Sequence, residues 1–214
     1  MRLQTPTGEI VIEIPETARK IAVLHSATTD STLLLYCILK EIETTGAATE
    51  VLVLQKGGEP TAYNCSLVKA CNALFLSPKV EVLPQVGPSH VALRAVLMTY
   101  VRRSDIDFLY TSAIANPPLS ANILGTPPTK PSEESEKVKL PFRKFTRADI
   151  IKAYYDLGIQ EMLKFTRTCA DYPYGVCNRC FFCNERKWAF ETVSQVDPFS
   201  PPDWVVPDYF RQVL

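Results

Sequence analysis

The sequence has few histidines, no excess of either charge and no long hydrophobic run. Lysine and arginine together number 23, as do aspartate and glutamate, so no net charge would draw the chain to nucleic acid or to an anionic membrane. The longest apolar run, Leu33 to Leu39, is too short to span a bilayer. The N-terminal segment lacks the apolar core of a signal peptide. We therefore expect a cytoplasmic protein that binds neither nucleic acid nor a membrane, with His25 and His90 as structural residues rather than catalysts.

The remaining composition predicts one folded domain over residues 1–214. With 46% hydrophobic and 21% charged residues, the chain resembles an ordinary globular protein and is long enough to bury a core. Ten of its 17 prolines lie in residues 117–141 and 198–207, where they predict ordered loops and a tail rather than a second core. We expect that tail, which is rich in aromatic residues, to consist of residues 197–214.

Short apolar runs alternate with segments of helical periodicity along most of the chain. Strands are predicted at 10–14, 20–25, 51–54, 80–83, 107–111 and 138–142, and helices at about 31–45, 60–73, 89–103 and 146–157 and through Trp188 and Phe190. This alternation predicts an α/β fold with a doubly wound, mostly parallel sheet. Such sheets bind ligands in the crevice at the carboxyl ends of their strands.

Four of the seven cysteines lie close together near the C-terminus. Cys177, Cys180 and Cys183 form two overlapping C-x2-C steps, and Cys169 precedes them across a short loop. Four thiolates at such spacing suit a tetrahedral Zn²⁺ ion, and a closed shell of four protein ligands leaves no position for a reacting water. We therefore predict a structural zinc site in a segment at about 165–192. Three nearby cations are expected to offset part of the thiolate charge: Arg179, Arg186 and Lys187.

Two other interpretations of the cysteine cluster remain open. An iron–sulfur cluster uses the same four ligands. Disulfides or unliganded thiols are also compatible with the spacing, although cysteines this dense in a cytosolic chain more often bind metal.

The residues that follow the apolar run 20–25 are rich in hydroxyl groups. Ser26, Thr28, Thr29 and Ser31 stand between this predicted strand and the next helix, with Ala27 and Asp30 among them. Free N–H groups and the dipole at a helix N-terminus favour an anion, and the hydroxyls would add donors to phosphate oxygens. The alternative is a helix cap, with Thr29 or Asp30 holding the first turn. The residues alone leave both interpretations open.

The order of strand, S-x-x-x-D-S, helix and late four-cysteine cluster resembles the PP-loop ATP pyrophosphatase superfamily. Within it, the chain is most similar to the 7-cyano-7-deazaguanine synthases of queuosine biosynthesis. Ser26, Asp30 and Ser31 match the family's S-G-G-x-D-S loop, and the four cysteines match its zinc ligands. Residues 138–159 and the helix after Cys183 also look similar. The resemblance implies a PP-loop α/β domain over 1–214.

The resemblance also implies a function. A member of this family would be an ATP-dependent carbon–nitrogen ligase, converting a 7-carboxy-7-deazaguanine-type carboxylate and ammonia to the nitrile through an adenylate. ATP and Mg²⁺ would bind at residues 26–31, where Asp30 would help to position the metal or cap the helix, and the zinc would be structural. The resemblance identifies no catalytic base. A homodimer is compatible with this interpretation.

The loop also departs from the family pattern. Ala27 and Thr28 replace two glycines, which permit positive φ and a close approach of the backbone to phosphate. We expect Thr28 to be the sharper change, because a β-branched residue resists positive φ. Two alternatives follow: a degenerate homologue that keeps fold and zinc as a non-catalytic binding or assembly protein, or a sibling PP-loop enzyme that acts on another carboxylate or a protein terminus.

Overall fold

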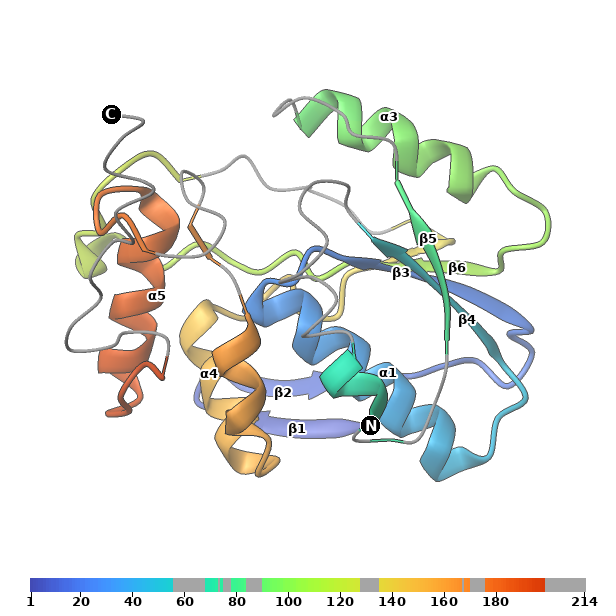
Figure 1. The fold of residues 1–214 in the computed structure, drawn as a ribbon, viewed down its shortest axis with the longest axis horizontal. Helices are drawn as coiled ribbons and strands as arrows, with labels where there is room; N and C mark the ends of the chain where they lie inside the picture. Colours follow the sequence, from blue (N-terminus) through green and yellow to red (C-terminus); the bar gives the residue numbers. More distant parts are fainter. Residues whose placement is uncertain are drawn as a thin grey trace.

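The computed structural model describes residues 1–55, 68–72, 74, 78–83, 90–127, 135–166, 168–169 and 176–198. Its centre is a five-stranded parallel sheet of strand order β5-β4-β3-β6-β7 (Figure 1). Its strands are β3 (Lys20–His25), β4 (Glu50–Gln55), β5 (Lys79–Val82), β6 (Phe108–Tyr110) and β7 (Val138–Lys139). The doubly wound parallel sheet predicted from the sequence is confirmed.

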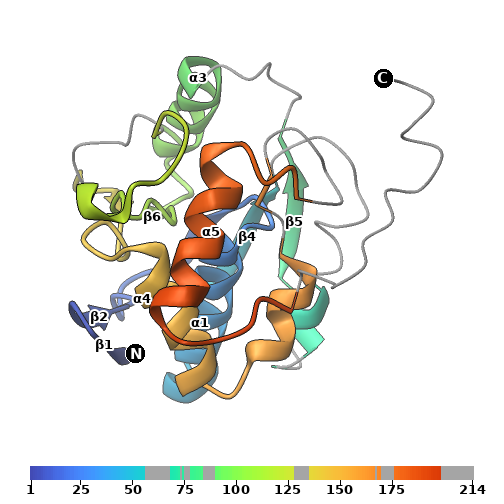
Figure 2. The same ribbon diagram turned by 90° about the vertical axis from the view of Figure 1, so that its left-hand side faces the viewer.

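The main helices cover the sheet on both sides. They are α1 (Thr29–Thr45), α3 (His90–Val101), α4 (Arg147–Asp156) and α5 (Phe181–Thr192). Figure 1 shows α3 on one side of the sheet and α1 with α4 on the other. Turned by 90°, the molecule presents α5 as the outermost helix, in front of α4 and α1 (Figure 2). No helix in the described ranges has the length and apolar character needed to cross a membrane.

Strand β3 has an unbroken apolar sequence because both faces of the sheet are covered. Side chains of successive strand residues point to opposite faces. Ile21 and Val23 accordingly belong to the hydrophobic cluster that includes α1 and α4, whereas Ala22 belongs to the cluster that includes Tyr100 of α3. Strand β3 therefore packs against helices on both faces of the sheet, and this packing determines the position of its carboxyl end.

Several predicted elements differ from the structure in their limits. The strand predicted at 10–14 is β2 (Gly8–Val11), which pairs antiparallel with an unpredicted strand, β1 (Arg2–Thr5). The strand predicted at 138–142 was too long: β7 ends at Lys139 because the chain then turns, with Arg143 N donating to Leu140 O at 3.0 Å. Of the helix predicted at 60–73, residues 68–72 are helical, and the tail beyond residue 198 lies outside the described residues.

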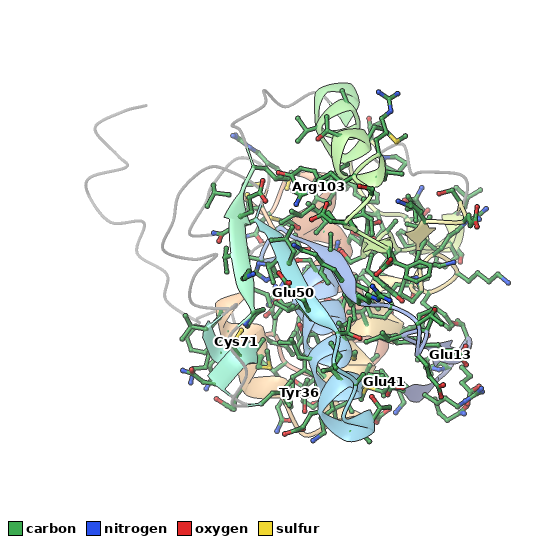
Figure 3. The ribbon with its side chains drawn as sticks, turned by 90° about the vertical axis from the view of Figure 1, so that its right-hand side faces the viewer. Glu13, Tyr36, Glu41, Glu50, Cys71 and Arg103 are labelled. Carbon is green, nitrogen blue, oxygen red and sulfur yellow. The ribbon has the colours of Figure 1, made fainter. Side chains whose placement is uncertain are left out.

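The two ends of the sheet differ in chemistry. At the amino ends of the strands, Glu50 Oε1 lies 3.3 Å from Lys20 Nζ and 3.0 Å from Lys79 Nζ. Arg103, which follows α3, pairs with Asp105 at 2.8 Å, and Figure 3 shows Glu50 on the sheet and Arg103 beside α3. Ion pairs thus close the amino end, while the carboxyl ends of β3 and β6 lead into segments rich in hydroxyl groups.

Candidate functional site

The candidate nucleotide loop, residues 26–31, lies at the topological switch point of the sheet. Strand β3 pairs with β4 on one side and with β6 on the other, and the chain reverses its winding direction between these two neighbours. Ligands of doubly wound folds bind at this position. Ser112, two residues beyond β6, reaches across and donates from Oγ to Asp30 Oδ2 at 3.0 Å.

The polar groups of the loop converge on Ser31 Oγ. The backbone N–H groups of Ser26 and Thr28 donate to this oxygen at 3.2 and 3.1 Å. Ser26 Oγ and Thr28 Oγ1 lie 3.3 and 3.1 Å from it. Two N–H groups and two hydroxyls therefore surround a single oxygen atom. A phosphate oxygen accepts hydrogen bonds from the same kinds of donor.

Helix α1 is capped by Thr28, and not by Thr29 or Asp30 as the alternative interpretation of the loop expected. Thr28 has φ −76 and ψ 163, and Ser31 N donates to its side-chain oxygen at 3.4 Å. The Ser31 hydroxyl completes a capping box with the Thr28 backbone. At its other end α1 stops at Gly46, which has φ 67, a conformation that favours glycine.

The departure from glycine affects the backbone at Ala27 rather than at Thr28. Ala27 has φ 56, in the left-handed region that residues with a Cβ enter at a cost. Thr28 lies in the extended region, where a β-branched residue is unstrained. The expectation that Thr28 is the sharper change was therefore wrong. The alanine keeps a backbone conformation that favours glycine.

A buried ion-pair chain runs from the loop into the helices behind it. Arg147 Nη1 lies 3.1 Å from Asp30 Oδ1 and donates to Thr29 Oγ1, and Arg147 Nε donates to Glu185 Oε2 at 3.0 Å. Arg147 and Glu185 are 4% and 1% exposed. Burial by itself would lower the pKa of Arg147, but the two carboxylates raise it, so the guanidinium stays charged. Tyr154 OH adds a further contact to the loop by donating a hydrogen bond to Thr29 O at 2.8 Å.

The sequence interpretation missed Arg147, Glu185 and Ser112. One signal was present: Arg147 is the first residue of α4, where a cation opposes the helix dipole. A cation at that position calls for a compensating anion elsewhere in the fold. The same helix begins with a capping box, in which Thr146 N donates to Asp149 Oδ2 at 2.8 Å.

His25 ends β3 directly before the loop and is fully buried. Its Nε2 lies 3.4 Å from Thr32 Oγ1 in α1. Burial lowers its pKa to about 4, so the imidazole is neutral at pH 7 and has a structural environment. The side chain of His90, the first residue of α3, lies outside the described part of the structure.

The four predicted cysteine ligands gather at the start of α5. Their sulfur atoms all lie within 4.8 Å of one another, and Cys177 Sγ and Cys183 Sγ are 3.9 Å apart. Sulfurs about 2.3 Å from one tetrahedral ion are roughly 3.8 Å apart, so the cluster fits a single metal ion with a small contraction. Burial raises the pKa values of Cys177 and Cys183, and a divalent cation offsets this effect by binding thiolates.

The side chain of Arg186 binds the segments that precede and follow the cysteine cluster. It pairs with Asp197, with Nε and Oδ2 2.6 Å apart, and donates to the hydroxyls of Thr166 and Thr168 at 2.9 and 3.0 Å. These contacts tie the segment that carries Cys169 to α5. Lys187 instead lies 3.9 Å from Glu191 at the surface.

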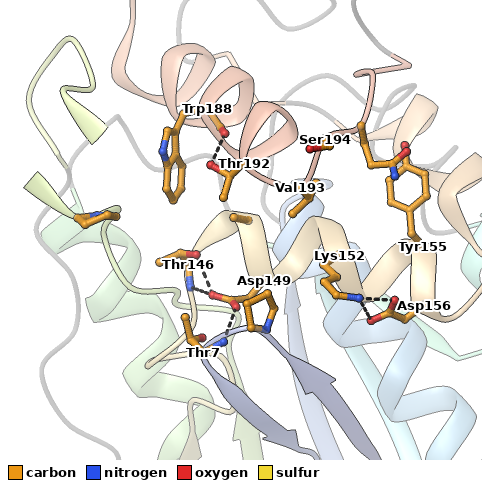
Figure 4. Close-up of a pocket in the computed structure, with 14 residues that line it drawn as sticks. Thr7, Thr146, Asp149, Lys152, Tyr155, Asp156, Trp188, Thr192, Val193 and Ser194 are labelled. Atoms are coloured by element: carbon orange, nitrogen blue, oxygen red, sulfur yellow. Dashed lines mark hydrogen bonds and ion pairs between the residues drawn. The ribbon is translucent and has the colours of Figure 1, made fainter. Parts of the chain in front are cut away.

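A cavity of about 540 Å³ lies elsewhere, between α4 and α5 (Figure 4). Trp188 and Tyr155 form part of its walls, and its charged groups pair with neighbours, as Lys152 does with Asp156 at 2.6 Å. The described lining includes neither the 26–31 loop nor the cysteine cluster. The cavity is therefore separate from both predicted sites.

A family described as "Queuosine biosynthesis protein QueC" matches residues 13–194. The chain belongs to the QueC family. Among solved structures, it is similar to the U34-tRNA thiolase NcsA from Methanococcus maripaludis with its [4Fe-4S] cluster. That match has 14% identity and a TM-score of 0.46, and covers 86% of this chain and 68% of the thiolase. No curated protein matches the chain.

Membership in the QueC family gives this chain the PP-loop fold and an ATP-dependent, synthase-like role in queuosine biosynthesis. In the structure, residues 26–31 follow the carboxyl end of β3, the first strand of the main sheet. The four-cysteine cluster adds a site that suggests metal binding.

Proposed function

We propose that this QueC-family chain converts 7-carboxy-7-deazaguanine and ammonia to 7-cyano-7-deazaguanine at the expense of ATP. ATP adenylates the carboxylate and pyrophosphate leaves, and ammonia then displaces AMP to give the amide. A second activation of the amide oxygen allows loss of that oxygen with AMP and formation of the nitrile. The protein is proposed to act in the cytoplasm.

The observation that carries this proposal is the group of donors around Ser31 Oγ at the switch point of the sheet. Rotation of the Ser31 side chain would move Oγ away and release the N–H groups of Ser26 and Thr28 for the oxygens of a leaving pyrophosphate, at the positive end of α1. Asp30 would help to hold Mg²⁺, which would share the phosphate charge. Arg147, whose Nη1 lies 3.1 Å from Asp30 Oδ1, orients this carboxylate.

We propose that Cys169, Cys177, Cys180 and Cys183 hold a structural zinc ion. Sulfur atoms within 4.8 Å of one another are grouped as for one ion. The thiolates of a four-iron cluster bind four separate irons and would be spread more widely. Elemental analysis tests this directly: about one zinc per chain supports the proposal, and iron with acid-labile sulfide contradicts it.

The activity is tested by incubating the purified chain with Mg-ATP, 7-carboxy-7-deazaguanine and ammonium, and measuring pyrophosphate and the nitrile by mass. Ser26→Ala removes a hydroxyl donor, and kcat/KM should fall about 10- to 100-fold if that donor reaches a charged phosphate. Ser104→Ala is the matched control, because Ser104 is exposed at the opposite end of the sheet.

Each negative outcome has a distinct meaning. Pyrophosphate release that requires a different carboxylate would replace the substrate and keep the reaction class. No pyrophosphate release and no stabilisation by Mg-ATP would contradict the enzymatic proposal, and would leave a binding or assembly role for the fold.

A further inference from the structure

Four residues connect the cysteine cluster to the candidate nucleotide loop through the protein interior. Cys183 is two residues from Glu185 on α5, Glu185 Oε2 accepts from Arg147 Nε at 3.0 Å, and Arg147 lies 3.1 Å from Asp30 Oδ1. Glu185 and Arg147 are almost completely buried, so water does not screen these pairs as it would at the surface. The path joins α5, α4 and the start of α1, which are far apart in sequence.

We propose that metal occupancy of the four-cysteine cluster and nucleotide occupancy of the 26–31 loop are coupled through Glu185 and Arg147, which act as positioning residues. The proposal rests on the proposed function, because it takes nucleotide as the ligand of the loop.

The geometry of Arg147 supplies the first argument. Its guanidinium is planar and donates in fixed directions, so rotating it toward one partner moves it away from the others. Nε faces Glu185, while Nη1 faces both Thr29 and Asp30. The orientation of the Glu185 carboxylate therefore determines where Arg147 holds the two loop residues.

The start of α5 supplies the second argument. Cys180 is the N-cap residue of α5 and forms no side-chain capping hydrogen bond, and Cys183 lies in the first turn. A metal held by these sulfurs anchors the turn that precedes Glu185. Metal loss should loosen this turn first.

The third observation is the charge balance of the ion pairs that Arg147 forms with Glu185 and Asp30. Two carboxylates share one buried guanidinium, so removing the Arg147 charge would leave both carboxylates without the cation that they share. No donor among the described residues reaches Glu185 Oε1, so Arg147 holds this carboxylate through Oε2. Such a network has intact and broken arrangements rather than a graded series. A ligand that requires Asp30 and Thr29 in place favours the intact one, and linkage makes the effect reciprocal.

The test measures metal release from the full metal-loaded chain to a chromogenic zinc chelator, with and without a non-hydrolysable ATP analogue and Mg²⁺. In the wild type we expect nucleotide to slow release by on the order of 10-fold. Glu185→Gln keeps the shape of the side chain and all four sulfurs but removes its charge, so metal should still bind while the nucleotide effect is lost. Glu191→Gln, on the exposed part of the same helix, is the matched control.

A second measurement needs no nucleotide. Amide hydrogen exchange at residues 26–31 should be slower in the metal-loaded than in the metal-free wild type. It should be the same in both forms of Glu185→Gln. Arg147→Lys keeps the charge but not the fork, and should lose the coupling as well, with no further loss in the double variant.

The outcomes separate this inference from the proposed function. Nucleotide that binds to the wild type without changing metal release would overturn the coupling and leave the function standing. Loop exchange that responds to metal equally in the wild type and in Glu185→Gln would also overturn it. Failure of the wild type to bind nucleotide, with metal-dependent exchange intact, would overturn the nucleotide arm together with the proposed function.

Discussion

The substitution Ala27→Gly tests the backbone of the candidate nucleotide loop. Ala27 has φ 56 and is fully buried, at a position where glycine would adopt the same backbone freely. We expect the variant to fold with nearly unchanged stability and to keep nucleotide binding, because the direction of the loop N–H groups depends on φ rather than on the methyl group.

Three opposing effects set the magnitude. Relief of the left-handed conformation stabilises the variant by about 1–2 kcal/mol. The greater freedom of glycine in the unfolded chain destabilises it by about 0.4–1 kcal/mol. Loss of the buried methyl group removes about 0.8 kcal/mol more. The sum lies within about 1 kcal/mol of zero, which corresponds to a change in Tm of about 2–4 °C for a chain of this size.

The assay is chemical unfolding of the variant and the wild type, together with titration of Mg-ATP. Gly46→Ala is the matched control, since Gly46 has φ 67 and an added Cβ would meet no atom within 4 Å. It should lose up to about 1.5 kcal/mol, because left-handed strain of about 1–2 kcal/mol exceeds the entropic gain. This control isolates the backbone contribution.

A loss of more than about 2 kcal/mol in Ala27→Gly would contradict this prediction, since the methyl group would then be a major packing contact. Unchanged stability with loss of nucleotide binding would show that the loop needs the restriction of alanine.

Three further predictions concern the metal segment and the core. Gly125→Ala would place a Cβ 2.9 Å from Phe181 N at the start of α5, so we expect the variant to lose about 2–4 kcal/mol of stability and to retain metal less tightly. Chemical unfolding and elemental analysis measure these two effects. Stability and metal content equal to those of the wild type would contradict the close packing. Cys180→Ser should lower the metal content and make the C-terminal third sensitive to protease. Cys71→Ser, outside the cluster, is the control and should retain the metal. Full metal content in Cys180→Ser would show that Cys180 is not a ligand. Burial lowers the pKa of His25 to about 4, so between about pH 6.5 and 4 the unfolded chain binds a proton that the native state excludes. The free energy of unfolding should therefore fall by about 1.4 kcal/mol per pH unit as the pH drops from about 6.5 toward 4. Unfolding at pH 7 and pH 5 should show a shallower decrease in His25→Gln, and parallel decreases would contradict the assignment.

The sequence by itself determined the elements that local patterns specify. The apolar run 20–25 is a strand buried on both faces, Gly46 ends α1, and the C-x2-C steps bring three cysteines to one place because they lie within seven residues. Periodicity and turn chemistry act between near neighbours, so they can be read along the chain. The order of strands and helices was enough to place the loop at the carboxyl end of β3.

Only the tertiary structure decided which distant groups complete the site. Arg147 meets Asp30 across 117 positions and Glu185 across 38, and no local pattern signals such pairs. The cap of α1 and the positive φ of Ala27 likewise depend on how β3 and α1 pack, and the short β7 depends on the turn after it. Such long-range contacts form where whole helices and strands pack together. Sequence patterns miss them because packing and charge compensation between separate elements decide how these elements pack.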